Sequence, residues 1–185
     1  MSLNAEELSL NLLERVLTRL GLSNRPAPTL DGLRTLYAAW CRNVPFDNVR
    51  KLIHVHHHDS GPLPGDDATD FFEAWLAYGT GGTCWAGNGA LYTLLLSLGF
   101  HASRGIGTML VAPHIPPNHG TVLVTYDDTR YVVDASILHS EPLRLDTGAV
   151  VRITKADKTL PLAVMPDTSF FSVVRQKLKW SGSNI

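Results

Sequence analysis

The chain has 185 residues and a formal net charge of −1, with 44% hydrophobic and 18% charged residues. This composition predicts a packed globular protein and excludes a disordered chain, and no run of Lys or Arg points to nucleic acid or an anionic membrane as a partner. No secretory signal or membrane-spanning run is visible, and two cysteines are too few for a disulfide scaffold, so we expect a cytoplasmic protein.

The first 80 residues are predicted to be mainly helical. Apolar residues at helical spacing predict a first helix over residues 6–20. Thr29 is a good N-cap for a second helix, which Pro45 ends. The His-, Gly- and Pro-rich residues 54–67 predict a loop, and residues 70–78 predict a third helix.

The histidines of that loop raise the question of a metal site. His54, His56 and His58 would share one face of a strand, an arrangement that suits zinc or nickel. No cysteine supports the cluster, and the nearest acid is Asp59. We therefore interpret the segment as a solvated loop and expect no functional metal.

From position 79 onward the pattern changes from a glycine-rich turn to a helix and then to short strands. The turn covers residues 79–83, and the helix after it carries leucines at helical spacing, with Gly99 as its C′ residue. Beyond Gly99, runs rich in β-branched residues predict four strands, at residues 105–111, 121–125, 130–134 and 150–153.

Cys84 lies at the first turn of the predicted helix. Backbone N–H groups are unpaired there and the helix dipole is positive, so a thiolate is stabilised and the thiol pKa falls from its ordinary value of about 8.5. The same N–H groups can stabilise an oxyanion during acyl transfer. Cys41, which lies late in the second helix between Trp40 and Arg42, is typical of a structural thiol.

His119 and Asp134 are candidates for a base and its orienting acid, because they lie on two successive predicted strands. Residues 127–128 are a plausible turn between these strands. A loop of two or four residues centred there makes Thr121 face Asp134 and places His119 at a diagonal position on the same face, about 7–8 Å away. An odd-length loop would separate them, so a Cys84–His119–Asp134 triad predicts an even-length loop.

Each of these three residues also has an ordinary structural interpretation. A cysteine at a helix start is often a buried small hydrophobic residue. His119 follows a Pro-rich loop and could be a surface histidine, and Asp134 could simply end a strand. The positions alone leave both interpretations open.

Several short motifs are spread along the middle of the chain. Residues 81–88 read Gly-Gly-Thr-Cys-Trp-Ala-Gly-Asn, residues 44–48 read Val-Pro-Phe-Asp-Asn, and residues 98–100 read Leu-Gly-Phe. His119 precedes a glycine, and Asp134 ends Tyr-Val-Val-Asp. In type and order these features resemble the Arg-Gly-Gly-x-Cys-aromatic-Glu-x-Asn, Pro-Phe-Glu-Asn and Leu-Gly-Phe motifs of arylamine N-acetyltransferases, with their catalytic His and Asp.

The resemblance implies an α+β fold in two parts. An N-terminal helical lobe with the nucleophile helix (residues 1–98) would precede an antiparallel, β-barrel-like lobe that carries His119 and Asp134 (residues 99–185). The two lobes would form a papain-like cysteine core, and the third, lid domain of the family would be reduced or absent.

The resemblance also implies a ping-pong reaction without a metal. Acetyl-CoA, as co-substrate, would acylate Cys84, and a small-molecule acceptor (an arylamine, hydrazine or N-hydroxyarylamine) would take the acetyl group. His119 would exchange protons with the thiol, and Asp134 would orient the imidazole. Phe46 and Trp85 would line the acceptor site.

The chain departs from the family pattern at several positions. Thr80 stands for the family Arg and Ala86 for the family Glu, Asp47 replaces the Glu of Pro-Phe-Glu-Asn, and residues 135–139 replace a glycine-bearing loop. These departures keep two alternatives open. The same core could serve an amide synthase or a thioester or amide hydrolase with another acyl donor, or it could belong to a catalytically silent binding protein.

Overall fold

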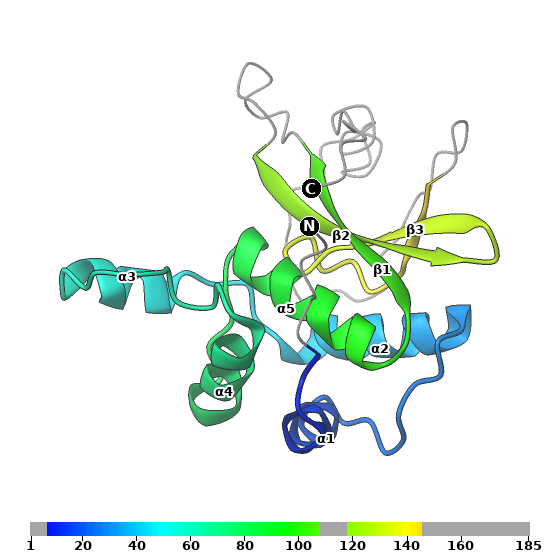
Figure 1. Ribbon diagram of the computed structural model, residues 1–185, viewed down its shortest axis with the longest axis horizontal. Coiled ribbons are helices and arrows are strands. Elements are labelled where there is room, and N and C mark those ends of the chain that lie inside the picture. Colours follow the sequence, from blue (N-terminus) through cyan, green and yellow to red (C-terminus); the bar gives the residue numbers. More distant parts are fainter. Residues whose placement is uncertain (1–6, 108–117, 146–185) are drawn as a thin grey trace, which may run out of the picture.

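A computed structural model describes residues 7–107 and 118–145. In this part of the chain helices precede an antiparallel sheet, as predicted, but there are five helices where the sequence predicts four (Figure 1). None of the described helices is long and apolar enough to cross a membrane. The elements are α1 (Leu10–Arg19), α2 (Leu30–Asn43), α3 (Val49–His56), α4 (Ala68–Tyr78), α5 (Cys84–Ser97), β1 (His101–Gly107), β2 (His119–Tyr126), β3 (Thr129–Val133) and β4 (Leu143–Arg144).

Two helix ends lie where the sequence predicts them. Thr29 is the N-cap of α2, and its hydroxyl accepts a hydrogen bond from the third helical N–H. The chain leaves α5 at Gly99, whose φ is +81°. There the N–H groups of Gly99 and Phe100 donate to the carbonyl groups of Leu96 and Leu95, the pair of bonds that defines a Schellman motif.

Helix α5 lies in the middle of the molecule, between α4 and the sheet formed by β1 and β2 (Figure 1). It is rich in Leu and Ala and is buried along most of its length. Helices and strands therefore share one hydrophobic core, which contains residues from α1 (Leu13, Val16), α2 (Leu36, Trp40), α4 (Phe71, Trp75), α5 (Leu91, Leu94) and β2–β3 (Val122, Val133). Burial of both faces of α5 fixes the position of its N-terminus.

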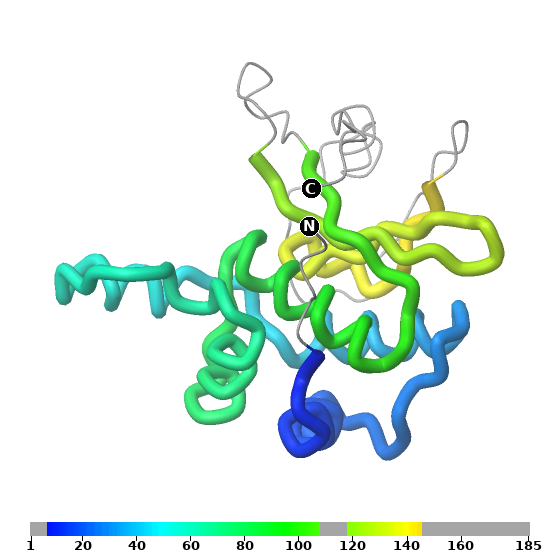
Figure 2. Tube along the Cα trace, in the orientation of Figure 1, coloured from blue at the N-terminus to red at the C-terminus, as the bar shows by residue number. Residues whose placement is uncertain are grey.

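The β2–β3 hairpin has the even-length loop that the sequence predicts. Its two loop residues, Asp127 and Asp128, have φ values of +48° and +55°, as a type I′ turn requires. In the resulting register Val122 pairs with Val133, which brings His119 and Asp134 onto the same face. Figure 2 shows this hairpin as the loop at the right-hand edge of the view.

The remaining strands differ from the prediction. Strand β1 begins at residue 101, four residues before the predicted start at 105, because pairing with β2 sets its start and not its composition, which includes His101, Ser103 and Arg104. Residues 108–111 of the predicted strand lie outside the described residues. The two-residue strand β4 was not predicted, and the predicted strand at 150–153 lies outside the described residues. The sheet order β1-β2-β3-β4 is linear, so in the described residues the sheet is open and is not a closed barrel.

The prediction of a loop from residue 54 is wrong at its start, because His54 and His56 belong to α3. Val49, Leu52 and Ile53 lie on one side of this helix, and Arg50 and His54 lie on the other, which is a helical period. Within residues 7–107 and 118–145, no group of three or more His, Cys, Asp or Glu side chains is placed to hold a metal ion.

Candidate active site

The loop that precedes Cys84 is held by the residues that follow α2. The Asp47 carboxylate accepts a hydrogen bond from the Gly81 N–H at 2.7 Å, and the Lys51 ammonium donates to the Thr83 hydroxyl at 2.7 Å. A Cβ atom at Gly81 would lie 1.7 Å from the Pro45 carbonyl oxygen, so only glycine allows this approach. Cys84 is thereby held as the first residue of α5.

The Cys84 thiol is half-buried and has a lowered pKa. The main cause is its hydrogen bond with the His119 side chain, and the N–H groups of Gly120 and Trp85 also stabilise the thiolate, while burial opposes ionisation. The thiolate-stabilising N–H group of Trp85 belongs to the first turn of α5, as the sequence predicts.

His119 lies between the thiol and Asp134. Its Nε2 atom is 2.7 Å from Asp134 Oδ2, which leaves Nδ1 for Cys84, and the two residues are only 4% and 1% exposed. Burial lowers the pKa of His119, but its bonds to Asp134 and Cys84 outweigh this effect and raise the pKa to about 9. Burial raises the pKa of Asp134, whereas the bond to His119 lowers it, with a net value of about 2. Hydrogen bonds therefore join the three side chains in series, with a charged imidazole in the middle.

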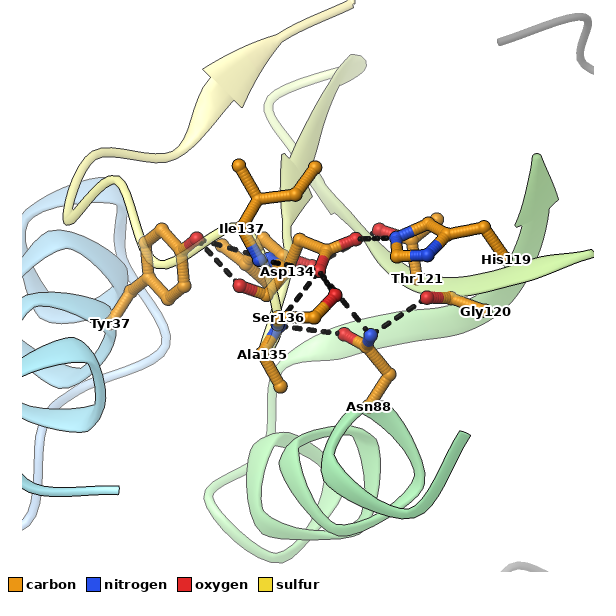
Figure 3. A network of polar contacts seen from close by, with 10 residues as sticks. Tyr37, Asn88, His119, Gly120, Thr121, Asp134, Ala135, Ser136 and Ile137 are labelled. Carbon is orange, nitrogen blue, oxygen red and sulfur yellow. Dashed lines mark hydrogen bonds and ion pairs between the residues drawn. The ribbon is translucent and has the colours of Figure 1, made fainter. Parts of the chain in front are cut away.

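The second oxygen of Asp134 fixes the direction of its carboxylate (Figure 3). Asp134 Oδ1 accepts hydrogen bonds from the Ser136 hydroxyl at 2.6 Å, the Ser136 N–H at 2.9 Å and the Ile137 N–H at 3.1 Å. These donors come from the segment that replaces the family's glycine-bearing loop. They stabilise the ionised carboxylate and keep Oδ2 directed at His119.

Asn88 joins α5 to both strands that carry the acid and the base. Its Nδ2 atom donates to the Gly120 carbonyl at 2.7 Å and lies 3.4 Å from Asp134 Oδ1, and its Oδ1 atom accepts from the Ala135 N–H at 2.9 Å. Figure 3 shows the side chain rising from the helix between these partners. Because Asn88 is one helical turn after Cys84, it fixes the nucleophile helix to the strands of His119 and Asp134.

Sequence patterns pointed to Cys84, His119 and Asp134, but not to the residues that hold these three side chains in place. Asn88 was visible as a motif residue four positions after Cys84, a spacing that places both on one side of a helix. Ser136 follows Asp134 by two positions, which is the spacing of an Asx turn. Tyr37, which contacts Asp134 from α2, carried no signal in the sequence.

The two predicted acceptor-binding aromatics lie on either side of Cys84 in the chain. Phe46 forms a parallel bridge with Gly82 and is 50% exposed, and Trp85 is 53% exposed. The Trp85 ring packs on Gly120, where an added Cβ would be 3.0 Å from Trp85 Cε3. Both rings are thus accessible from solvent, Trp85 next to Cys84 in the chain and Phe46 on the segment that pairs with the loop before it.

The two positions that depart from the family signature are both enclosed. The hydroxyl of Thr80 is buried without a hydrogen-bond partner among the described residues. The methyl group of Ala86 packs so closely on Gly65 and Gly82 that a Cβ at either glycine would lie within 3.0 Å of it. Small side chains therefore occupy both positions in tightly packed surroundings.

Comparison with known proteins gives a consistent picture. A family model described as N-acetyltransferase matches residues 29–162. The arylamine N-acetyltransferase of Mycolicibacterium smegmatis is 33% identical over 144 residues, which are 72% of this chain and 50% of that protein. A relative from Salmonella typhimurium, named arylamine N-acetyltransferase / N-hydroxyarylamine O-acetyltransferase, is 28% identical over 73% of this chain and 48% of its own length.

Solved structures agree with these matches. The M. smegmatis arylamine N-acetyltransferase has a TM-score of 0.63 at 32% identity, over 76% of this chain and 53% of that one. The S. typhimurium enzyme has a TM-score of 0.66 at 25% identity, over 80% of this chain and 53% of that one. The chain spans about half the length of the curated relatives it matches. Because the family model covers more than half of the chain, the chain belongs to the arylamine N-acetyltransferase family.

Proposed function

We propose that this chain transfers an acetyl group from acetyl-CoA to an arylamine, a hydrazine or an N-hydroxyarylamine through an acetyl-Cys84 intermediate. The observation that carries the proposal is the hydrogen-bonded series Cys84, His119, Asp134 with a lowered thiol pKa. Membership of the family supports acetyl transfer as the reaction. A protein without catalysis would have no chemical reason to keep a buried imidazole between a thiol and a carboxylate.

In the proposed first half-reaction, the Cys84 thiolate attacks the thioester carbonyl carbon of acetyl-CoA. The Cys84 S–C bond forms, the C–S bond to CoA breaks, and the departing CoA thiolate takes a proton from the His119 imidazolium. The N–H groups of Trp85 and Gly120, which stabilise the sulfur anion at rest, are available to the carbonyl oxygen while it carries negative charge.

In the proposed second half-reaction, the acceptor nitrogen attacks acetyl-Cys84. The new C–N bond forms, the C–S bond to Cys84 breaks, and neutral His119 takes the proton that the nitrogen loses, which restores the thiolate–imidazolium pair. The Salmonella relative's name includes O-acetyl transfer to N-hydroxyarylamines, so an acceptor oxygen fits the same step. The exposed rings of Phe46 and Trp85 support a flat aromatic acceptor.

We also propose that two lobes supply different catalytic residues, as in a papain-like core. Residues 1–98 would supply the nucleophile at a helix N-terminus, and residues 99–185 would supply the base and acid on strands. The proposed chemistry requires a reduced thiol, which fits a cytoplasmic location.

Intact mass spectrometry after incubation with acetyl-CoA tests the proposal. We expect one acetyl group on the protein, located on Cys84 and removed when an arylamine is added. The Cys41→Ser variant is the matched control and should still be acetylated, whereas Cys84→Ser should not.

The alternatives predict other results. An acetyl group that leaves at the same rate without amine would identify a hydrolase. Fast reaction of Cys84 with iodoacetamide but not with acetyl-CoA would identify a different acyl donor, as in an amide synthase. A Cys84 thiol no more reactive than a free thiol would contradict the proposed function and leave a binding protein.

A further inference from the structure

Tyr37 reaches from α2 to the backbone of Asp134, which lies 97 positions later in the chain (Figure 3). Its hydroxyl donates to the Asp134 carbonyl at 2.9 Å and accepts from the Asp134 N–H at 3.2 Å. The side chain is fully buried. One hydroxyl therefore contacts both backbone polar groups of the residue that holds His119.

These two bonds replace strand pairing at the point where it stops. The β2–β3 ladder ends with Val122 and Val133, so Asp134 is the first residue of this strand without a partner strand. A buried backbone N–H or C=O without a partner is costly. The Asp134 C=O also accepts from the Leu138 N–H at 3.3 Å, but for the Asp134 N–H the Tyr37 hydroxyl is the acceptor.

We propose that Tyr37 is a positioning residue for the triad: by holding the Asp134 backbone it sets the direction of the carboxylate toward His119 and thereby the reactivity of Cys84. This inference rests on the proposed function of Cys84 as nucleophile. Without the hydroxyl, the Asp134 backbone loses its link to α2. The carboxylate, which its Oδ1 bonds orient relative to the residues that follow it, can then shift together with them away from His119 Nε2. A weaker bond to His119 stabilises the imidazolium less, so the thiolate loses its main partner.

Several titratable groups of the described residues face this contact. His119 faces the Asp134 carboxylate, the Cys41 thiol interacts with the Tyr37 hydroxyl, and the His139 ring packs edge-on against Tyr37 with centroids 5.2 Å apart. Burial above all, and then Cys41, raises the pKa of Tyr37 well above its ordinary value. Tyr37 therefore stays neutral while Cys84 and His119 titrate, and a change in the pH profile reports on those two groups.

The test is the pH dependence of Cys84 alkylation by iodoacetamide in Tyr37→Phe, a change that removes only the hydroxyl. The rate is followed at Cys84 by peptide mass spectrometry, because Cys41 is a second thiol. We expect the midpoint of the profile to rise by about one pH unit, which is about a tenfold lower rate at a fixed pH below both midpoints.

Trp75→Phe is the matched control. Trp75 is also fully buried among the helices, and its Nε1–H donates to the Asn43 carbonyl at the end of α2, at 3.2 Å, rather than to a member of the triad. This variant also loses one polar contact of a buried aromatic ring, so its urea midpoint should fall at least as much as that of Tyr37→Phe. Its alkylation profile should match that of the wild type.

The outcomes separate the inference from the proposed function. A wild-type midpoint at the value of a free thiol would overturn the function itself. A low wild-type midpoint that Tyr37→Phe leaves unchanged would overturn only the role of Tyr37. Equal shifts in Tyr37→Phe and Trp75→Phe would also overturn it, because they would reveal a general loss of packing.

Discussion

The two halves of the active site differ in how firmly they are held. His119 and Asp134 are buried, and each oxygen of the carboxylate has its own hydrogen-bond partners. Around Cys84 the side chains are open to solvent, since both Phe46 and Trp85 are half exposed. In the proposed function, a preorganised network would therefore transfer the proton, whereas the surface that would meet the acceptor is accessible.

This difference follows from the chemistry that each half would perform. A base must keep one direction and begin each half-reaction in one protonation state, and buried, fully bonded groups achieve this because no water competes for their bonds. An acceptor must enter and leave, which requires accessible rings beside the nucleophile. We therefore expect substitutions in the buried half to have large effects and substitutions in the open half to have small ones.

The largest effect is expected from Asp134→Asn. The amide cannot stabilise the imidazolium, and its NH₂ group can face His119 Nε2 and fix the wrong tautomer. By analogy with the loss of about 10⁴ in a Ser–His–Asp triad, the rate of Cys84 acylation should fall about 10³–10⁴-fold. Single-turnover acylation by an activated phenyl ester measures this rate without a need for CoA binding. A loss below about tenfold would mean that Asp134 does not act through His119.

The next effect concerns stability and comes from Asn88→Ala. The change leaves the Gly120 carbonyl and the Ala135 N–H without their buried partner, so we expect a loss of about 2–3 kcal/mol in the free energy of unfolding, together with a higher Cys84 pKa. Asn43→Ala is the control, because Asn43 Nδ2 donates to the Leu20 and Ala39 carbonyls within the helices. Urea unfolding and alkylation profiles should show a stability loss in both variants but a pKa change only in Asn88→Ala.

Some features of the buried half could be predicted from the sequence, and others could not. Local chemistry was sufficient for the hairpin, since Asp127 and Asp128 favour a two-residue turn and the parity of the loop then determines which residues share a face. Local sequence was also sufficient to predict that the Cys84 thiol lies at the start of α5. Asn88 was recognisable only as part of a motif, and its three partners depend on how α5 packs against the strands.

Contacts and strand positions that depend on tertiary packing could not be predicted from the sequence. Tyr37 contacts Asp134 across 97 positions, and no local pattern encodes such a distant contact. Strand β1 was displaced by four residues because pairing with β2, and not composition, sets its start. In α3, a His-rich segment was interpreted as a loop although its apolar and polar residues follow a helical period.

The pH dependence of stability tests whether the His119–Asp134 bond holds in the absence of the thiol. The pKa of His119 is raised from 6.5 to about 9, so the stability it contributes is complete below about pH 6.5 and is lost as the pH rises through its folded value. Asp134 behaves oppositely, since its pKa is lowered from 3.8 to about 2, and its contribution is lost only as the pH falls toward that value.

Both proteins in this test carry Cys84→Ser, because the lowered thiol pKa contributes stability of opposite sign in the same range. In this background Asp134 still raises the pKa of His119. The difference in the free energy of unfolding between the protein with His119 and the His119→Gln variant should therefore shrink as the pH rises from about 6.5 through the folded pKa of His119, which is lower than in the wild type because the Cys84 contribution is absent. A constant difference would mean that the imidazole is not charged in the folded protein.

The smallest effect is expected in the open half, from Gly120→Ala. The added Cβ would lie 3.0 Å from Trp85 Cε3, so the ring must move, but a ring that is 53% exposed has room to do so. We expect a cost of about 1 kcal/mol in the free energy of unfolding, at the low end of overpacking effects. In the Trp85→Ala background the same change should cost less, because the contact is gone. A cost above about 3 kcal/mol in the wild type that the Trp85→Ala background relieves would show that the Trp85 ring is held as rigidly as His119 and Asp134, and the contrast between the two halves would then be wrong.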